Sequence, residues 1–268
     1  MDTQRVDLQD IWLLYSSGKQ TYRQLAAQFN CSTKTIQRYI DKVRLSPRKE
    51  FACVANVIMD TTYFGSWGVM VFKNSLDGSI LFKQYVLNET NELYLSGIQE
   101  ITRRGISVQS IVCDGKPGIF DVFDDIPMQM CQFHMLQIIN RKLTRKPQSI
   151  AAGALRKLAL KLTEQTRDEF TNNLNIWYLE YKNYYNEYDI SESTGKKIYT
   201  HRRLRSAYKS LRKYLPYLFV YQNYKELMIP NTTNALDGLF SDLKNKLRNH
   251  NGLSKQRKMK YIDGFFKA

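Results

Sequence analysis

Three aspartates, Asp60, Asp114 and Asp237, are the residues of this 268-residue chain best suited to do chemistry. Asp60 closes the strand-like run 51–60, and Asp114 closes a second such run, 106–114. Carboxylates held at strand ends bind divalent metal ions, which can activate an attacking oxygen or stabilise a developing negative charge. The three acids therefore predict a metal site.

The charge of the chain indicates what such a site would act on. There are 40 Lys and Arg against 25 Asp and Glu, a formal net charge of +15. Residues 51–140 hold five basic residues against nine acidic ones, whereas residues 141–268 hold 26 against 11. A weakly acidic section between basic ones suits a polyanion such as nucleic acid. Solvated surface charge is the alternative explanation.

Composition and length indicate a folded protein of one large domain with an appendage, or of two to three smaller units. Hydrophobic residues make up 43% and aromatic residues 13%, which argues against disorder. No apolar run approaches the roughly 20 residues that span a bilayer, and residues 1–5 do not resemble a signal peptide. The four cysteines show no paired spacing, so we expect a reduced, cytoplasmic protein.

Residues 1–48 are expected to form an all-α domain. Apolar spacing predicts helices over residues 6–16, 21–29 and 33–43. Thr21 lies three residues before Gln24, which is the spacing of a capping box at the start of the second helix. Two helices joined by a turn of three to four residues form a helix-turn-helix, whose second helix reads DNA.

The outward residues near the start of the third helix are polar and suit phosphates and base edges. These residues are Thr33, Lys34, Thr35, Gln37 and Arg38. Three-helix units with no DNA role also exist, so that alternative stays open. Residues 46–49, Ser-Pro-Arg-Lys, are expected to form a linker to the next domain.

Residues 51–145 predict an α/β domain. We expect strands over residues 51–61, 67–74, 79–87, 106–113 and 127–131. Helices are expected over residues 91–104, about 117–124 and about 133–145. Three strands, helix, strand, helix, strand, helix is the order of the ribonuclease-H-like mixed sheet. In that topology the first and fourth strands are neighbours, which would bring Asp60 and Asp114 to one sheet edge.

Residues 146–230 predict an almost wholly helical insertion, and residues 231–268 a final core helix, about 233–248, followed by a tail. The cluster of tyrosines at 178–188 is expected to pack between helices rather than to stack on bases. The helix that begins near His201 carries the cations Arg202, Arg203 and Arg205. We expect these cations along DNA phosphates, with a solvated helix face as the alternative.

Cys131 and His134 form a Cys-x-x-His pair. A structural zinc site needs four ligands, and this pair lacks two of them. A buried cysteine beside a histidine at a helix start is therefore the favoured interpretation, and a structural or DNA-positioning role stays open.

Five short motifs then carry a resemblance to a known family. They are Met-Asp60-Thr-Thr-Tyr-Phe-Gly, Cys-Asp114-Gly, Met-Cys131-Gln-Phe-His, Tyr-Thr-His201-Arg-Arg-Leu-Arg and Asn-Thr-Thr-Asn-Ala-Leu-Asp237-Gly. In this order and spacing, over roughly residues 8–266, they resemble the Mutator-type transposases of bacterial insertion sequences.

The resemblance implies a DDE-type transposase with a ribonuclease-H-like core and a helical insertion before the last acidic residue. Asp60, Asp114 and Asp237 would be catalytic and would hold two Mg²⁺ or Mn²⁺ ions. The enzyme would nick element ends to free a 3′-hydroxyl and direct it at target phosphates, without a covalent intermediate.

The partners implied are double-stranded DNA, namely the terminal inverted repeats of the element and the target, and no membrane. Since a transposase pairs two DNA ends, a homodimer or larger assembly on DNA is expected. The implied location is the bacterial cytoplasm, in association with the nucleoid.

Two features depart from the family pattern. Family members usually carry Glu where this chain has Asp237, and Asp withdraws the carboxylate by about 1.5 Å, the length of one C–C bond. Relatives often carry a zinc ribbon ahead of the helix-turn-helix, and none is seen in this sequence. Glu226 and Asp242 are rival third ligands, but Glu226 lies outside the motif and Asp242 falls on a different helix face.

Two other functions stay open. A catalytically inactive DNA-binding protein derived from such an element would be consistent with the Asp237 departure. A ribonuclease-H-like host nuclease acting on RNA–DNA hybrids or junctions is also possible in chemical terms. The helix-turn-helix argues against the nuclease, because reading duplex sequence suits defined element ends better.

Overall fold

The structure is a computed structural model that describes residues 7–45, 53–123, 125–250 and 252–266. It divides into two compact units. The terminal unit comprises Met1–Phe51 together with Asp237–Ala268, and the central unit comprises Ala52–Leu236. Both ends of the chain therefore belong to one unit, a grouping that the sequence did not indicate. The expected linker at 46–49 lies outside the described residues.

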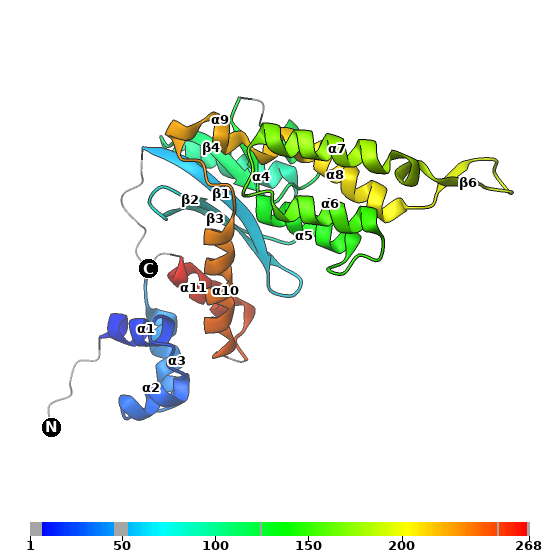
Figure 1. Ribbon diagram of the computed structural model, residues 1–268. Helices are drawn as coiled ribbons and strands as arrows, with labels where there is room; N and C mark the ends of the chain where they lie inside the picture. Colours follow the sequence, from blue (N-terminus) through cyan, green and yellow to red (C-terminus); the bar gives the residue numbers. More distant parts are fainter. Residues whose placement is uncertain (1–6, 46–52, 124, 251, 267–268) are drawn as a thin grey trace, which may run out of the picture. The chain divides into compact units, whose positions relative to one another are not determined.

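The central unit is built on a mixed five-stranded sheet with the order β3-β2-β1-β4-β5 (Figure 1). The strands are β1 (Val54–Tyr63), β2 (Gly68–Asn74), β3 (Ile80–Val86), β4 (Ser107–Cys113) and β5 (Met128–Met130). β1, β2 and β3 pair antiparallel, whereas β4 pairs parallel with both β1 and β5. The α/β class and the neighbouring positions of the first and fourth strands are confirmed.

The β2–β3 hairpin follows from its turn residues. Gly78 adopts a φ of +75°, which a residue with a side chain rarely accepts. Its backbone N–H donates to the carbonyl of Asn74 at 3.0 Å, and the Asp77 side chain accepts from the N–H of Ser79 at 2.8 Å. This turn fixes the antiparallel register of β2 and β3, and β2 in turn pairs with β1.

Two helices and one short turn complete the core of the central unit. They are α4 (Asn91–Arg103), the 3₁₀ turn η1 (Ile119–Asp121) and α5 (Gln132–Leu143). The helix expected over 117–124 is thus a single 3₁₀ turn. Thr90 caps α4, and Tyr94, Ile98 and Ile101 bury its apolar face in the core that also contains Phe72.

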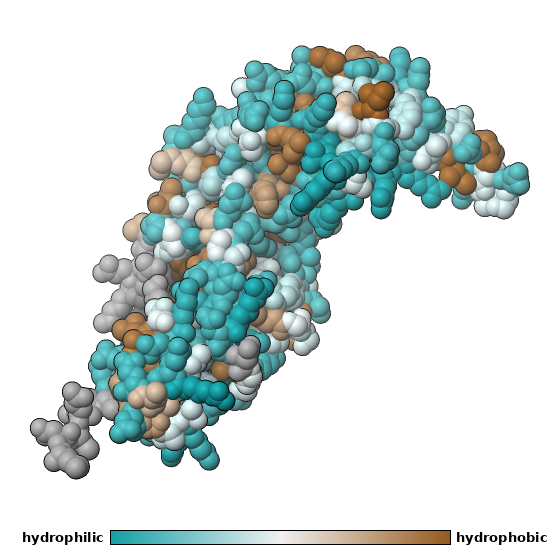
Figure 2. All heavy atoms as spheres, turned by 60° about the horizontal axis from the view of Figure 1, so that its bottom comes forward, coloured by the Kyte–Doolittle hydropathy of each residue, from teal (hydrophilic) through white to brown (hydrophobic). Residues whose placement is uncertain are grey.

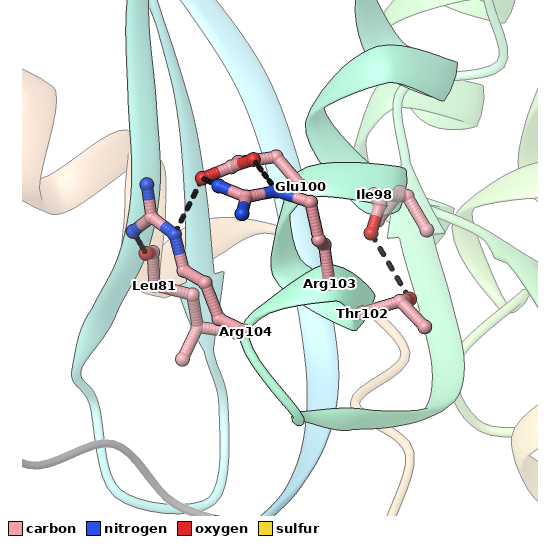
Figure 3. Close-up of polar contacts among 6 residues, drawn as sticks. All are labelled: Leu81, Ile98, Glu100, Thr102, Arg103 and Arg104. Carbon is pink, nitrogen blue, oxygen red and sulfur yellow. Dashed lines mark hydrogen bonds and ion pairs between the residues drawn. The ribbon is translucent and has the colours of Figure 1, made fainter.

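Two ion pairs at the C-terminal end of α4 orient Arg104, which forms a hydrogen bond to the sheet (Figure 3). Glu100 accepts from Arg103 and from Arg104, both at 2.8 Å, along one face of the helix. Arg104 also donates to the carbonyl of Leu81 on β3 at 3.2 Å (Figure 3). The Arg104 guanidinium therefore links the end of α4 to β3. Because β3 is the edge strand of the sheet, its outward-facing backbone groups have no neighbouring strand to pair with.

The insertion is mostly helical but contains a hairpin that was not expected. Its elements are α6 (Ile150–Leu160), α7 (Arg167–Asn186), β6 (Tyr188–Ile190), β7 (Lys197–Tyr199), α8 (Arg202–Leu218), α9 (Val220–Asn223) and the 3₁₀ turn η2 (Lys225–Leu227). The β6–β7 hairpin projects beyond α7 and α8 (Figure 1). Trp177 stacks on Tyr208 at 5.2 Å and donates to the carbonyl of Ala151, so aromatic packing joins α6, α7 and α8.

The terminal unit contains the three expected helices, α1 (Leu8–Ser16), α2 (Tyr22–Gln28) and α3 (Thr33–Lys42). The capping box between Thr21 and Gln24 is confirmed. α10 (Asn234–Arg248) leads into a further helix, α11 (Lys255–Phe265), which replaces the expected tail.

α11 packs directly on α1 and contacts α3. A Cβ atom on Gly264 would lie 2.0 Å from Trp12 Cζ2, so only glycine permits this close approach. Tyr261 donates its hydroxyl to the carbonyl of Ser16 at 2.8 Å. Arg257 pairs with Asp41 of α3 through two bonds, of 2.7 and 3.1 Å. The last helix therefore supplies part of the core of the terminal unit.

Two further expectations concern membranes and cysteines. In the part of the chain that the structure describes, no helix combines the length and the apolar character needed to cross a bilayer. The cysteines at 31, 53, 113 and 131 are all free thiols.

The space around two helical glycines predicts that their substitution by alanine changes stability in opposite directions. A Cβ on Gly97 would lie 2.1 Å from the ring of the buried Phe72, so Gly97→Ala should lower the free energy of unfolding by about 1–3 kcal/mol. Gly153 in α6 has open space around it, so Gly153→Ala should raise that free energy by about 0.5–1 kcal/mol. Urea unfolding followed by circular dichroism measures both. A Gly97→Ala protein as stable as the wild type would contradict the packing.

Candidate functional site

The parallel pairing of β1 with β4 aligns Asp60 and Asp114. The register pairs Asn56 with Ser110, Val57 with Ile111 and Ile58 with Val112. Asp60 and Asp114 each follow two residues later on their own segments. The two acids are therefore aligned where the β1–β4 pairing ends, as the sequence predicted. Asp114 directly follows β4, but the prediction that Asp60 closes its strand was wrong, because β1 continues to Tyr63 in pairing with β2.

Side-chain alternation places the two acids on the same face of the sheet. Successive side chains of a strand point to opposite faces, so residues two and four positions apart share a face. Asn56 and Ser110 share one face, because the Ser110 hydroxyl donates to Asn56 Oδ1 at 2.8 Å. Asp60 and Asp114 each lie four residues further along, on that face. The opposite face carries Val57 and Ile111, which belong to the hydrophobic core.

The end of the insertion and the segment that follows it run along the face that carries Asn56. Asn56 donates its side-chain N–H to the carbonyl of Leu227, and Lys73 of β2 donates to the carbonyl of Ala235 at 3.3 Å. Both contacts lie within the central unit. These two hydrogen bonds fix the segment 227–235 against β1 and β2.

Asp114 is held by a rigid turn. Its carboxylate accepts from the N–H of Lys116 at 3.1 Å. Gly115 has a φ of +81°, and a Cβ there would meet the side chain of Met130 at 2.6 Å. Tyr214 of α8 donates its buried hydroxyl to the Gly115 carbonyl at 2.8 Å. Position 115 therefore requires glycine, and Tyr214 of the insertion supports the turn that carries Asp114.

Asp60 is held from its own strand and from α4. Its Oδ1 accepts from the N–H of Thr61 at 2.7 Å. The Thr61 hydroxyl lies 3.1 Å from the hydroxyl of Tyr94, which donates to Glu89 at 2.8 Å. This chain of bonds links the neighbour of Asp60 to the start of α4.

Glu89 is an acid that sequence reasoning missed. Burial raises the pKa of Glu89, the hydrogen bond from Tyr94 opposes that rise, and the negative charge of Asp114 adds to it. Glu89 therefore lies within electrostatic reach of Asp114. Its position just before the cap of α4 was the available signal, but no motif marked it.

Two hard carboxylate donors at one sheet edge suit Mg²⁺. That ion is commonly held by one or two carboxylates and keeps its other positions for water and substrate phosphates, rather than being enclosed by protein. Among the residues that the structure describes, no three His, Cys, Asp or Glu side chains are grouped so as to hold a metal ion. In donor chemistry, the carboxylates of Asp60 and Asp114 are of the kind that Mg²⁺ binds.

Cys131 and His134 fasten the segment that leads into α10. Thr233 donates both its N–H and its hydroxyl to Cys131 Sγ at 3.3 Å, and the hydroxyl also lies 3.3 Å from His134 Nδ1. Burial alone would raise the pKa of the Cys131 thiol, but hydrogen bonds with His134 and Thr233 outweigh it and lower that pKa. The Cys-x-x-His pair is thus a buried tether between α5 and residue 233.

The third predicted acid, Asp237, lies in the first turn of α10. It belongs to the terminal unit, whereas Asp60 and Asp114 belong to the central one. The pairing that the structure describes is that of Asp60 with Asp114. Of the rival ligands, Asp242 is in an ion pair with Lys246 at 3.0 Å, and Glu226 is exposed in η2.

The predicted recognition residues lie on the first two turns of α3. Thr33, Lys34 and Arg38 are exposed, whereas Thr35 and Gln37 are half-buried. The Thr35 hydroxyl lies 2.9 Å from that of Ser32, whose side chain caps α3. The terminal unit as a whole holds 17 Lys and Arg against 8 Asp and Glu, a net charge of +9. Its exposed cations suit a polyanion.

The three arginines near His201 have different environments. Arg205 donates to the carbonyl of Tyr185 at 2.7 Å and lies 3.5 Å from the ring centroid of Tyr199. Arg202 and Arg203 are exposed at the start of α8. Arg205 thus anchors the β6–β7 hairpin, and the other two face solvent.

Comparison of the chain with protein-family models and with curated proteins finds no match. What the site can do is therefore inferred from the chain itself, which supplies two aligned carboxylates, three short N-terminal helices and an excess of cations.

Burial of His250 makes the stability of the terminal unit depend on pH. His250 is 7% exposed, and its ring lies 4.2 Å from that of Tyr15 and 5.1 Å from that of Tyr261. Burial lowers the pKa of His250, and a backbone hydrogen bond with Tyr15 opposes this only in part. The unfolded chain therefore binds this proton more readily than the folded chain does.

Stability should accordingly be lost as the pH falls through the ordinary histidine pKa of about 6.5. His250→Phe keeps an aromatic ring in the cluster and removes the titrating group. Urea unfolding of both proteins between about pH 7.5 and about pH 5 should show a smaller loss of stability in the variant. An identical pH dependence of the two proteins would contradict the assignment.

Proposed function

We propose that the protein is a DDE-type DNA transposase with a ribonuclease-H-like core. The observation that carries the proposal is the parallel register that aligns Asp60 with Asp114 on one face of a mixed sheet. The sheet order β3-β2-β1-β4-β5 and the resemblance of five successive motifs support it. The helix-turn-helix and the positive charge supply the means to hold DNA.

In this proposal Asp60 and Asp114 hold divalent ions, and Asp237 is the third acid. Bound Mg²⁺ or Mn²⁺ would activate the attacking oxygen and stabilise the leaving one in phosphoryl transfer. The protein's part is to fix the donors. The turn at Gly115, supported by Tyr214, orients Asp114, and the backbone of Thr61 orients Asp60. A rigid support of this kind is what open metal sites require.

The remaining parts of the chain select the substrate. The exposed residues of α3 would read element ends in the major groove, as the second helix of a helix-turn-helix does. Figure 2 shows that the face in view is predominantly hydrophilic, with hydrophobic side chains only in small, scattered patches. Such a surface suits a charged nucleic acid better than an apolar partner.

A strand-transfer assay tests the proposal. Purified protein, Mg²⁺ or Mn²⁺ and a duplex carrying the inverted repeats that flank its gene should join 3′-ends to target DNA. Asp60→Asn and Asp114→Asn should each lower the rate by at least about 10²-fold, since each removes a charge used in the transition state. Asp168→Asn, an exposed acid in α7, is the matched control and should leave the rate unchanged.

Binding to the same duplex should persist in all three variants, because the recognition helix is untouched. Strand transfer that survives both substitutions would contradict the proposal. Specific end binding by a wild-type protein that transfers no strands, and that gains no activity from Asp237→Glu, would favour a DNA-binding protein without catalysis.

A further inference from the structure

A second functional feature lies in the insertion, away from the acids. A pocket of about 410 Å³ opens where the end of α5, the start of α6 and the start of α8 meet. Lys142, Arg202 and Arg203 line it, together with His201 and Tyr184. No Asp or Glu is among its lining residues. The charged side chains that line the pocket are therefore basic, and the acid nearest to them is Glu187, which contacts His201.

The pocket combines mobile and fixed positive groups. Arg202 and Arg203 are exposed, and within the described chain neither side chain is engaged in an ion pair or side-chain hydrogen bond. Lys142 is half-buried and donates to the hydroxyl of Ser206, which keeps its ammonium group at the pocket. Two guanidinium groups that are free to turn inward, beside a fixed ammonium, match the oxygens of a phosphate.

The backbone adds to this charge. α8 begins at Arg202, and its N-cap residue, His201, makes no side-chain capping bond. The first N–H groups of a helix have no partner within the helix, and its N-terminus carries a partial positive charge. The same residues that line the pocket therefore present backbone donors as well as cations.

His201 is fixed rather than free. Its ring stacks on that of Tyr184 at 3.6 Å, and its Nε2 lies 2.7 Å from Glu187. These contacts hold His201, the N-cap residue of α8, against α7 and its C-cap. His201 and Tyr184 thus form a fixed part of the pocket wall, whereas Arg202 and Arg203 are exposed.

We infer that this pocket binds a phosphate group of the DNA backbone. The inference rests on the proposed function, which supplies DNA as the substrate. A run of exposed cations, Arg141, Arg145 and Lys146, continues along the chain from the pocket. A free anion would need only the pocket, whereas an extended DNA backbone would contact both the pocket and these exposed cations. The insertion would in this way hold the duplex at a position separate from the recognition helix.

Fluorescence anisotropy with a labelled duplex of arbitrary sequence tests the inference. Arg202→Gln with Arg203→Gln should weaken binding about tenfold at low salt, because bonds to a charged phosphate are lost. The slope of log affinity against log salt should fall by about 1. Lys157→Gln with Lys161→Gln removes the same charge from exposed positions of α6 and its C-cap, outside the pocket. That control pair should keep the slope of the wild type.

Three results would overturn the inference. The first is a pocket variant that binds the duplex as tightly as the wild type. The second is an equal loss of duplex affinity in the pocket and control variants. The third is a wild-type protein that inorganic phosphate, but not the duplex, protects against heat unfolding. Each single substitution, Arg202→Gln or Arg203→Gln, should show part of the effect, which serves where the double variant folds poorly. Because this assay needs no catalysis, its failure is distinct from a failure of strand transfer.

Discussion

The parallel pairing of β1 with β4 is the constraint on which the central unit depends. A one-residue slip would turn Asp60 to the apolar face of the sheet and bring Met59 to the polar one. The hydrogen bond between Ser110 and Asn56 resists such a slip, because both are fully buried and each would lose its partner. Core packing and the alignment of two carboxylates are thus enforced by the same register.

Around this pair the structure supplies supports from distant parts of the chain. α4 reaches Asp60 through Tyr94 and Thr61, and α8 reaches Asp114 through Tyr214 and Gly115. Residues before α10 are tethered to α5 through Cys131. The helical insertion therefore supports the turn that carries Asp114, in addition to the phosphate site proposed for it. Its removal would be expected to loosen Asp114.

Local patterns in the sequence were sufficient for much of this arrangement. Asp60 and Asp114 were recognisable because each ends a strand-like run, and the capping box at Thr21 marked α2. Glu89 and the pocket at Arg202 could not be found in this way, since both depend on contacts between segments far apart in the chain. α11 was missed because its apolar residues, such as Tyr261, bury against α1 and look like a tail without that partner.

The central claim is that Asp60 and Asp114 together hold a divalent metal ion. Titration of Mn²⁺ into the protein alone, followed by electron paramagnetic resonance, tests this without DNA or turnover. The wild type should bind Mn²⁺, and Asp60→Asn and Asp114→Asn should each weaken binding by at least about tenfold. Asp168→Asn should bind as the wild type does. Equal Mn²⁺ binding by the wild type and both site variants would contradict the claim.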